Sequence, residues 1–380
     1  MLTQTAKDEL VRQQYRIVGE HSAVKTCGWT KNMIKGKGGC YKLKFYGIMS
    51  NQCMQMTTSI SCANRCVFCW RGYKAPVSKE WKWGVDDPEL IFDGSIKAHH
   101  KLLAGFGGQP EAKHMFEMSK KIKHVALSLT GEPITYPRMN ELLLKFNKEG
   151  ISTFLVTNSQ YPDQIRDLNR VTQLYLSVDA PNRELLKKID LPLFPDYWER
   201  LNKSLEYCAQ KKDRTCVRLT IIKGLNDTNI EDYAKLIIKG NPDFIEIKSY
   251  MHVGPSRERL TIDHMPWHEE IVEFSKELMK YLPDYDIVIE HVPSRVVMCA
   301  KKTFKKNDKW FTWIDFNKWY ELVNSNKDYD KYDFLKQTPQ IGLSGRITKE
   351  EVSKIAERKR ERLAKQKKIF VDEKTNEMDL

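Results

Sequence analysis

The chain has 380 residues, of which 63 are Lys or Arg and 50 are Asp or Glu, so its formal charge is +13. Hydrophobic residues make up 41% and aromatic residues 11%, which provides for a large core and excludes wholesale disorder. No apolar stretch approaches the roughly 20 residues that a membrane helix needs, and residues 1–20 lack the apolar segment of a signal peptide. We therefore expect a soluble, cytoplasmic protein without membrane association, whose positive charge attracts a polyanion.

The first predicted element is an N-terminal extension, residues 1–56, which carries three of the nine cysteines. Cys27, Cys40 and Cys53 are spaced by thirteen residues each, and the sequence around them is polar and glycine-rich, a poor place to bury thiols as hydrophobes. Three thiolates suit an iron–sulfur cube with one open iron, and the intervening loops can wrap a cluster at a modest cost in closure entropy. The alternative is that all three are core residues.

A second cysteine motif, Cys62-x3-Cys66-x2-Cys69, follows a run that we interpret as the first strand of the next domain. In a reducing cytoplasm, clustered cysteines indicate metal ligands rather than disulfides. Three thiolates can hold three irons of a [4Fe–4S] cube and leave the fourth iron open to a small molecule. A zinc site usually takes four ligands from two knuckles, and the sequence has no second C-x2-C pair.

Strand and helix signals alternate through residues 57–300. Strands are expected at 124–129, 152–157, 172–178, 215–222, 243–249 and 285–290, and helices between them, for instance at 139–148 and 267–281. This alternation predicts βαβ units and a mainly parallel sheet. With the strand before Cys62 it gives six or seven repeats, which fit an incomplete (β/α) TIM-like barrel of the α/β class. In such barrels the chemistry lies at the carboxyl ends of the strands, where Asn158, Asp179 and Lys248 are found.

Residues 301–380 are expected to form a basic and aromatic appendage. Residues 301–309 hold five lysines against one aspartate, and residues 350–368 hold eight basic residues against four acidic ones. We interpret the second stretch as a solvated, charge-laced helix or frayed tail, with direct nucleic-acid contact as the alternative. The three remaining cysteines are isolated and expected to be buried small apolar residues: Cys208, Cys216 and Cys299.

The first family resemblance lies in the second cysteine motif. With Phe68 as its aromatic residue, Cys-x3-Cys-x-aromatic-Cys resembles the signature of the radical S-adenosylmethionine superfamily. The resemblance implies that the open iron binds the methionine amino and carboxylate groups of the cofactor, and that the reduced cluster cleaves it to a 5′-deoxyadenosyl radical. LTGEP, at 129–133, stands where the family has a Gly-Gly-Glu-like motif, with Thr130 in place of the first glycine. The expected S-adenosylmethionine-binding residues are Phe68, Gly131, Glu132, Pro133, Asn158, Ser177 and Asp179.

Further blocks narrow the resemblance. CMQMTTSISCANRCVFCWRGY, SLTGEPITYP, GNPDFIEIKSYMHVGPSRERLT and WFTWIDF resemble the 4-demethylwyosine synthase family of tRNA-modifying lyases in its single-domain archaeal form, from about residue 27 to residue 316. The resemblance implies two [4Fe–4S] clusters, the second held by Cys27, Cys40 and Cys53. It also implies that 1-methylguanosine in the anticodon loop of phenylalanine tRNA is joined with two carbons of pyruvate to give 4-demethylwyosine, an early step of wybutosine biosynthesis.

Two ways of holding pyruvate remain open. A lysine of lowered pKa could form a Schiff base with it, or the open iron of the second cluster could chelate it. Lys42 and Lys44 directly follow a cysteine of the second motif, and by its position relative to Cys40 we favour Lys42. The alternative is that both are solvated lysines that point the same way from a strand.

The tRNA would need phosphate contacts and a route for one base into a deep site. The expected contact residues are Arg71, Lys74, Arg257, Arg259 and Arg295. Aromatic residues could stack on loop bases, and the candidates are Trp70, Trp310, Phe311 and Trp313. For the last three, which belong to the WFTWIDF group, core packing is favoured. Four histidines could be proton carriers, tRNA contacts or structural residues, and the sequence does not choose between these roles: His252, His264, His268 and His291.

Other expectations concern partners. Eukaryotic relatives carry a flavodoxin-like domain, for which we see no room before residue 27, so a separate ferredoxin or flavodoxin is expected to reduce the clusters of a monomer. Two other functions stay open: a radical S-adenosylmethionine enzyme with a different substrate, and a non-catalytic iron–sulfur or zinc module that binds RNA.

Overall fold

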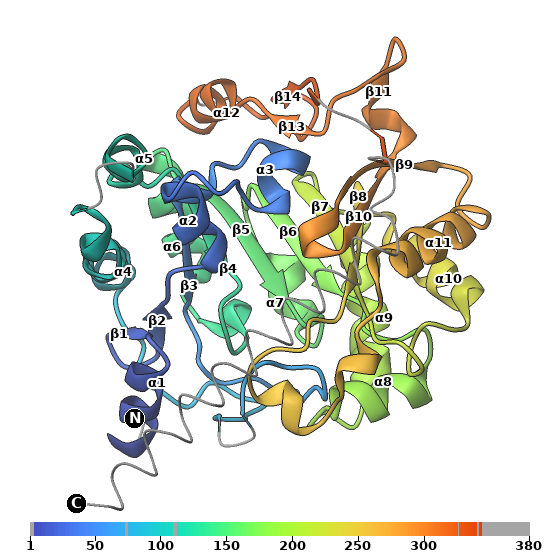
Figure 1. The fold of residues 1–380 in the computed structure, drawn as a ribbon, viewed down its shortest axis with the longest axis horizontal. Coiled ribbons are helices and arrows are strands. Elements are labelled where there is room, and N and C mark those ends of the chain that lie inside the picture. The colour runs from blue at the N-terminus through green and yellow to red at the C-terminus, as the bar shows by residue number, and fades with distance from the viewer. Residues whose placement is uncertain (1–3, 73–74, 109–111, 326, 340–341, 344–380) are drawn as a thin grey trace, which may run out of the picture. The chain divides into compact units, whose positions relative to one another are not determined.

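The structure is a computed structural model that describes residues 4–72, 75–108, 112–325, 327–339 and 342–343. Its centre is a ten-stranded sheet in the order β1-β2-β3-β4-β5-β6-β7-β8-β10-β9. Six consecutive strands of this sheet are parallel: β3 (Cys53–Thr57), β4 (His124–Leu127), β5 (Ser152–Thr157), β6 (Gln173–Ser177), β7 (Arg214–Ile221) and β8 (Phe244–Ser249). The sheet curves with helices along its outside (Figure 1), so the predicted incomplete (β/α) barrel is confirmed.

The helices of this layer follow the strands in chain order. They are α4 (Pro88–Leu103), α5 (Lys113–Ser119), α6 (Met139–Lys148), α7 (Pro162–Asp167), α8 (Arg183–Asp190), α9 (Tyr197–Cys208), α10 (Ile230–Gly240) and α11 (His268–Met279). Leu155 on β5 and Val217 on β7 face this layer and belong to the main apolar core together with Leu142 of α6. Strands covered in this way on their outer face are rich in Val, Ile and Leu, which explains why the sequence located them.

Within the predicted barrel, the strand ranges agree with the structure to within two residues at each end, but one strand of that region was missed. The expected seventh parallel repeat at 285–290 is β9 (Tyr285–His291), and β10 (Val296–Lys301) lies between it and β8, antiparallel to both. The connection from β9 to β10 is the short turn η7 (Val292–Ser294) followed by Arg295 at a φ of 46°. So short a connection can join only antiparallel strands, because a parallel neighbour requires a long crossover.

Inside the barrel, the amino ends of the strands are closed by an apolar plug. Phe154, Tyr175 and Phe244 point inward from β5, β6 and β8 and pack with Phe45 and Tyr46 of α3 (Tyr41–Tyr46). In the described part of the chain, this apolar cluster closes the barrel interior at the amino ends of the strands. Since α3 comes from the predicted N-terminal extension, the extension contributes to this plug.

The segment after residue 300 covers the plug. It contains β11 (Lys305–Lys306), β12 (Lys309–Trp310), β13 (Trp313–Ile314), α12 (Phe316–Val323) and β14 (Leu335–Lys336). Trp310 and Ile314 are buried in the same apolar cluster as α3, and the indole Nε1 of Trp313 donates to Lys44 O at 2.9 Å. Core packing, the favoured interpretation of the WFTWIDF group, is what these residues do.

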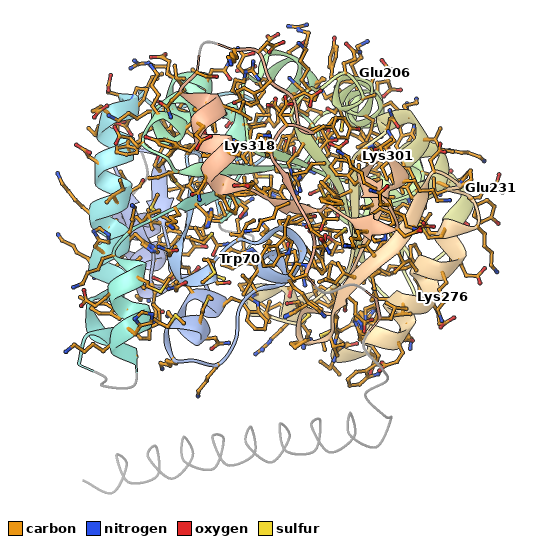
Figure 2. The ribbon with its side chains drawn as sticks, turned by 90° about the horizontal axis from the view of Figure 1, so that it is seen from above. Trp70, Glu206, Glu231, Lys276, Lys301 and Lys318 are labelled. Atoms are coloured by element: carbon orange, nitrogen blue, oxygen red, sulfur yellow. The ribbon has the colours of Figure 1, made fainter. Side chains whose placement is uncertain are left out.

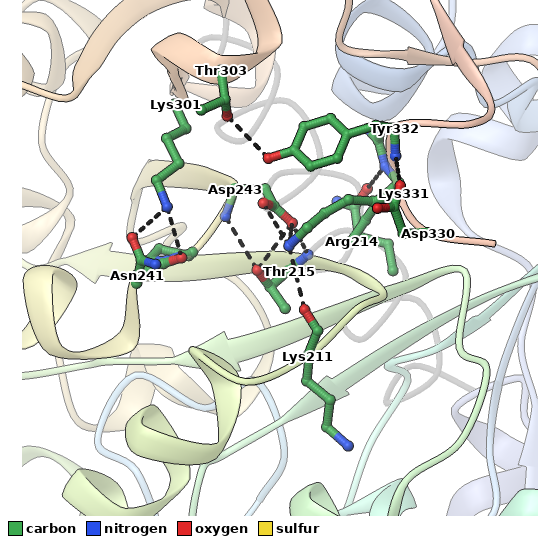
Figure 3. Close-up of polar contacts among 12 residues, drawn as sticks. Lys211, Arg214, Thr215, Asn241, Asp243, Lys301, Thr303, Asp330, Lys331 and Tyr332 are labelled. Atoms are coloured by element: carbon green, nitrogen blue, oxygen red, sulfur yellow. Dashed lines mark hydrogen bonds and ion pairs between the residues drawn. The ribbon is translucent and has the colours of Figure 1, made fainter. Parts of the chain in front are cut away.

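Polar contacts fasten this segment to the barrel (Figure 3). Lys331 Nζ lies 2.9 Å from Asp243 Oδ1, in an ion pair whose carboxylate is buried. Asp243 Oδ2 also accepts hydrogen bonds from the backbone N and Oγ1 of Thr215. Within the segment itself, Tyr332 OH donates to Thr303 Oγ1 at 3.2 Å.

The N-terminal part extends the sheet on its other side. α1 (Gln4–Arg12) leads to a hairpin of β1 (Arg16–Val18) and β2 (Ser22–Val24), and β2 pairs antiparallel with β3. α2 (Gly28–Ile34) and α3 follow before β3 begins. Residues 1–342 form one compact unit, so the described chain gives no separate test of the predicted divisions at 56/57 and 300/301.

The basic stretch 350–368 lies outside the described residues. No helix among the described residues is long and apolar enough to cross a membrane. Cys208, Cys216 and Cys299 are buried, as predicted, whereas the six cysteines of the two motifs are all partly exposed.

Candidate active site

Two sets of thiols lie toward the two ends of strand β3. The first thiol set, Cys62, Cys66 and Cys69, is on the loop that leaves the carboxyl end of β3, and Cys53 of the second thiol set is the first residue of that strand. Five residues of strand span about 13 Å. The backbone of β3 thus fixes a spacing between the two sets, whose other members are Cys27 and Cys40.

The loop of the first thiol set is docked on α8. The backbone N of Val67 donates to Ile189 O at 2.8 Å, and that of Arg65 donates to Asp190 O at 2.9 Å. The side chain of Asn64 donates to Asp190 Oδ2 at 3.0 Å. Burial and the carboxylate of Asp190 raise the pKa of Cys66. Asn64 and Asp190 were not singled out from the sequence, where nothing distinguishes them from ordinary surface residues.

Two arginines brace this loop from inside. Arg71 Nη1 donates to Ile60 O at 2.9 Å and to Pro76 O at 3.3 Å. Arg259 reaches across from the segment after β8 and donates to Val67 O at 2.9 Å, and also to the carbonyl of Cys69. Both guanidinium groups therefore hold backbone carbonyls around the thiols, and their predicted contact with tRNA stays a prediction.

Glu132 lies beside the first thiol set, at the carboxyl end of β4. Its backbone N donates to Ser61 O at 2.7 Å, and its Oε2 accepts the backbone N of Asn158 at 2.8 Å. Burial raises the pKa of Glu132 to about 7. Asn158 in turn directs its side-chain amide at Cys62 Sγ, 3.4 Å away. The residues predicted after β4 and β5 thus converge on the first thiol set.

Gly131 is required by the close approach of two loops. Its φ is 69°, and a Cβ there would lie 1.9 Å from Ser59 O, so a side chain fits neither the conformation nor the space. Thr130 stands where the resemblance expects another glycine. Its φ is not positive, so the backbone conformation does not require glycine at this position. Pro133 begins a short 3-10 turn, and its carbonyl accepts from Thr58 Oγ1 at 2.8 Å.

Two more predicted residues lie at the end of β6. The carbonyl of Ser177 accepts from Ser159 Oγ at 3.0 Å. Asp179 is buried, and its burial together with the charge of Asp190 raises its pKa. Asp179 and Asp190 are thus two buried carboxyl groups near the loop of the first thiol set.

The polar surroundings of the first thiol set fit S-adenosylmethionine. Several buried side-chain oxygens have no hydrogen-bond partner in the described part of the chain: Ser61 Oγ, Asn64 Oδ1, Glu132 Oε1, Asp179 Oδ1 and Asp190 Oδ1. Buried polar atoms are rarely left unpaired. These oxygens could accept hydrogen bonds from the amino and hydroxyl groups of the cofactor. Three thiols on one tight loop are likewise the donor set of a [4Fe–4S] cluster with an open iron.

The second thiol set lines a cavity of about 410 Å³ that we call the central cavity. Cys27 and Cys40 stand at the amino ends of α2 and α3, and the backbone N of Cys40 donates to Ser50 Oγ at 2.8 Å. Burial raises the pKa of Cys40 to about 11 and that of Cys53 to about 12. Nowhere in the described ranges do three Cys, His, Asp or Glu side chains form a site for a single metal ion. Three partly exposed thiols around one cavity suit a larger inorganic group.

Lys42 points into the central cavity, and Lys44 does not. Lys42 Nζ lies 4.6 Å from the centre of the Tyr175 ring and 5.6 Å from that of Phe154. Burial, with the nearby charge of Arg218, lowers the pKa of Lys42. Lys44 Nζ instead donates to Glu290 O at 2.9 Å. The alternative of two parallel strand lysines is wrong, because residues 41–46 form a helix on which positions two apart diverge.

Two further cations line the central cavity. Arg218 on β7 and Lys248 on β8 both line it. Lys248 Nζ donates to Ser294 O at 2.9 Å, and burial lowers the pKa of Lys248 to about 8. Lys248 was predicted from its place at a strand end, whereas Arg218 was missed. The signal that could have found it is an arginine in the apolar strand TCVRLTII.

Aromatic residues connect the two thiol sets. Phe68 and Trp70, from the loop of the first set, line the central cavity together with the cysteines of the second. Trp70 stacks on Tyr15 with ring centres 6.2 Å apart and planes 8° apart, and Lys25 Nζ lies 5.2 Å from its ring. Trp70 lies beside the blue N-terminal segment, within the outline of the molecule, whereas Glu231 and Lys276 lie at its edge (Figure 2).

The other predicted tRNA contacts lie outside this cavity. Arg257 Nε donates to His252 O at 3.1 Å, and Arg295 donates to Pro266 O at 2.8 Å and stacks on Trp267. Lys74 lies outside the described residues.

Three of the four histidines also have partners in the fold. His252 Nε2 bonds Leu260 O, His264 Nδ1 bonds Thr261, and His268 Nε2 lies 2.9 Å from Glu290 Oε2. The fourth, His291, packs edge-on against Trp29.

Comparisons with known proteins agree with this geometry. Residues 56–237 match the Radical SAM superfamily, and residues 239–301 match the family described as Wyosine base formation. The chain is 46% identical over 353 residues to the mouse S-adenosyl-L-methionine-dependent tRNA 4-demethylwyosine synthase TYW1, covering 91% of this chain and 49% of the mouse protein. The rice synthase is also 46% identical, over 91% of this chain and 53% of the rice protein. The chain thus spans about half the length of the curated relatives that it matches.

Two solved structures are similar over almost their whole length. A structure described as TYW1 with a lysine-pyruvate adduct bound has a TM-score of 0.73 and 35% identity, over 81% of this chain and 99% of its own. Archaeal TYW1 has a TM-score of 0.66 and 32% identity, over the same fractions. Sequence, fold and thiol placement agree, and the chain belongs to the tRNA 4-demethylwyosine synthase (TYW1) family of radical S-adenosylmethionine enzymes.

Proposed function

We propose that this chain is a tRNA 4-demethylwyosine synthase, which condenses 1-methylguanosine of phenylalanine tRNA with two carbons of pyruvate. The observation that carries the proposal is Lys42, a buried amine in a cavity lined by both Cys40 and Cys53 and by Phe68 of the first loop. A related structure is described as holding a lysine-pyruvate adduct, which is the chemistry that a buried amine of lowered pKa favours.

Cys62, Cys66 and Cys69 would hold three irons of a [4Fe–4S] cluster whose fourth iron takes S-adenosylmethionine. When bound and reduced, this pair would supply the radical chemistry that removes a hydrogen atom from the methyl group of 1-methylguanosine. Glu132 and Asp179 would orient the cofactor through their unpaired oxygens. Cys27, Cys40 and Cys53 would hold a second [4Fe–4S] cluster.

Lys42 performs the step that the chain itself supplies. Its neutral amine attacks C2 of pyruvate, a C–N bond forms, and the keto oxygen leaves as water with both amine protons. The resulting imine keeps C2 electrophilic, so an amino group of the purine can later displace Lys42 and close the new ring. Burial and the nearby positive charge of Arg218, which lower the pKa of Lys42, favour the neutral amine that this step needs.

The partners follow from the same proposal. The net charge of +13 suits a tRNA substrate. A separate ferredoxin or flavodoxin would deliver the electrons to a cytoplasmic monomer.

The test is anaerobic reconstitution with S-adenosylmethionine, pyruvate and tRNA containing 1-methylguanosine, followed by mass spectrometry of the nucleosides. Lys42→Arg keeps the charge but cannot form the imine, so it should yield no tricyclic nucleoside. Lys44→Arg is the matched control on the same helix and should stay active. Product from Lys42→Arg, or none from the unaltered chain, contradicts the proposal.

Iron content separates the other functions. Two cubes give about eight irons per chain and one cube about four. Cys62→Ala should abolish cofactor cleavage, whereas Cys40→Ala should spare some uncoupled cleavage and stop product formation. Zinc in place of iron would favour a non-catalytic module, and four irons in the unaltered chain would favour a different radical enzyme.

A further inference from the structure

Arg218 presents an arginine side chain to the central cavity from the middle of a barrel strand. On β7 it pairs in register with Glu246 of β8, and its side chain is 16% exposed while that of Glu246 is fully buried. Placing a guanidinium inside a barrel is costly unless it is paired. Glu246 supplies that pairing, with Nη2 of Arg218 2.9 Å from its Oε2.

One edge of the guanidinium is fixed by the protein. Nε and Nη2 donate to Glu246 Oε2 at 3.0 and 2.9 Å, and Nη2 also donates to Tyr41 OH at 2.9 Å. Glu246 is held in turn by Tyr46 OH, 2.9 Å from Oε1. The remaining nitrogen, Nη1, makes no hydrogen bond to any residue that the structure describes. The group is thus oriented with one donor left for a ligand.

The central cavity has the charge to receive an anion. Lys42, Arg218 and Lys248 line it, and no Asp or Glu is among its described lining residues. Lys42 Nζ and Arg218 Cζ lie 4.6 and 4.8 Å from the centre of the same Tyr175 ring. A 2-oxo acid carries its carboxylate on the carbon next to the keto group, so one small molecule can meet both residues.

We propose that Arg218 binds the carboxylate of the 2-oxo acid through Nη1 and so places its keto carbon at Lys42. The inference rests on the proposed function and adds a positioning residue that selects 2-oxo acids over neutral carbonyl compounds. Glu246, Tyr41 and Tyr46 hold the guanidinium in place, and Tyr175 supplies the surface that it shares with Lys42. Charge-assisted hydrogen bonds of this kind are directional as well as strong.

The test captures the imine on Lys42 by reduction with cyanoborohydride in the reconstituted protein, without tRNA. Capture is measured by mass spectrometry of the Lys42 peptide as a function of pyruvate or acetaldehyde concentration. Acetaldehyde offers a carbonyl without a carboxylate. The first variant is the double substitution Arg218→Gln with Glu246→Gln, which removes both charges and leaves a hydrogen-bonding pair. The second variant is Arg218→Lys, which keeps the positive charge but loses the planar set of guanidinium donors.

Both variants should raise the pyruvate concentration for half-capture roughly 10- to 100-fold, as for loss of a hydrogen bond to a charged group, with a much smaller effect on acetaldehyde. Lys44→Gln, which removes a charge outside the cavity, should leave the preference for pyruvate intact. An unchanged preference in the Arg218 variants, an equal loss for both carbonyl compounds, or a shift in S-adenosylmethionine dependence alone overturns the inference. No capture by the unaltered chain contradicts the proposed function instead.

Discussion

Lys331→Met should destabilise the whole barrel, because it removes the partner of a buried carboxylate (Figure 3). Lys331 Nζ lies 2.9 and 3.0 Å from the two oxygens of Asp243, which is 2% exposed. The two hydrogen bonds from Thr215 to Asp243 would remain. Asp243 would then be a buried charge without a counter-ion, which is the costly way to break such a pair.

The size of the effect follows from burial. Removing one partner of a buried pair costs about 3–5 kcal/mol, and the bonds from Thr215 place the expected loss near the lower end. Unfolding entropy scales with length, so for the 342-residue unit a loss of about 3 kcal/mol lowers the melting temperature by about 4 °C. The matched control is Lys212→Met, whose partner is Asp328 and whose side chain is 70% exposed. An exposed pair is worth about 0–1 kcal/mol.

The assay is thermal unfolding of anaerobically reconstituted protein, with both variants scanned at one rate. Equal melting temperatures for Lys331→Met and Lys212→Met would refute the argument from burial. A second readout is functional, because the same segment holds α3 through Thr312 Oγ1, which donates to Phe45 O at 2.7 Å. Imine capture by Lys42 should therefore fall more than cofactor cleavage does.

Two further predictions concern the first thiol set and α4. Gly131→Ala should abolish formation of 5′-deoxyadenosine, because the new Cβ would lie 1.9 Å from Ser59 O. The control is Gly224→Ala, which has a similar φ of 75° but lies in open space and should keep this activity. Formation of 5′-deoxyadenosine by Gly131→Ala would contradict the steric argument. Burial lowers the pKa of His99 from 6.5 to about 4, so the unfolded chain takes up a proton below pH 6.5 that the folded chain refuses, and stability falls as the pH drops. His99→Leu should remove about 1.4 kcal/mol of that loss at pH 5.5, measured as melting temperature against pH, while the exposed His100→Leu should not.

The sequence predicted the barrel because its strands are buried on the outer face by helices. Runs such as STFLVT, which is β5 (Ser152–Thr157), carry that burial in their composition. β10 escaped notice because nothing in VVMCAK distinguishes an inserted antiparallel strand from the continuation of β9; only the short turn between them decides the direction. β1 and β2, of three residues each, are too short to leave a periodic signal.

The residues of the candidate site also divide into those with a local sequence signal and those without one. Cysteines, Glu132 and Lys42 could be named in advance because their spacing or their place after a strand is visible in one dimension. Arg218 depends on which face of β7 turns inward and on Tyr41, 177 positions away, for its orientation. Asp190 acts on Cys66 only because α8 ends against the loop. Such relations are set by tertiary contacts that no local pattern records.

The plug of the barrel explains why the lysine comes from the N-terminal extension. Parallel barrels normally place their chemistry at the carboxyl ends of the strands, where the first thiol set lies. Here α3 closes the opposite end with Phe45 and Tyr46 and carries Lys42 on the same short helix. The two-carbon donor would therefore be held at the amino ends of the strands, and the radical would be generated at their carboxyl ends. Phe68 of the first loop lines the cavity that holds Lys42. A base entering at the carboxyl ends would meet both, and the length of β3 sets the distance that it must bridge.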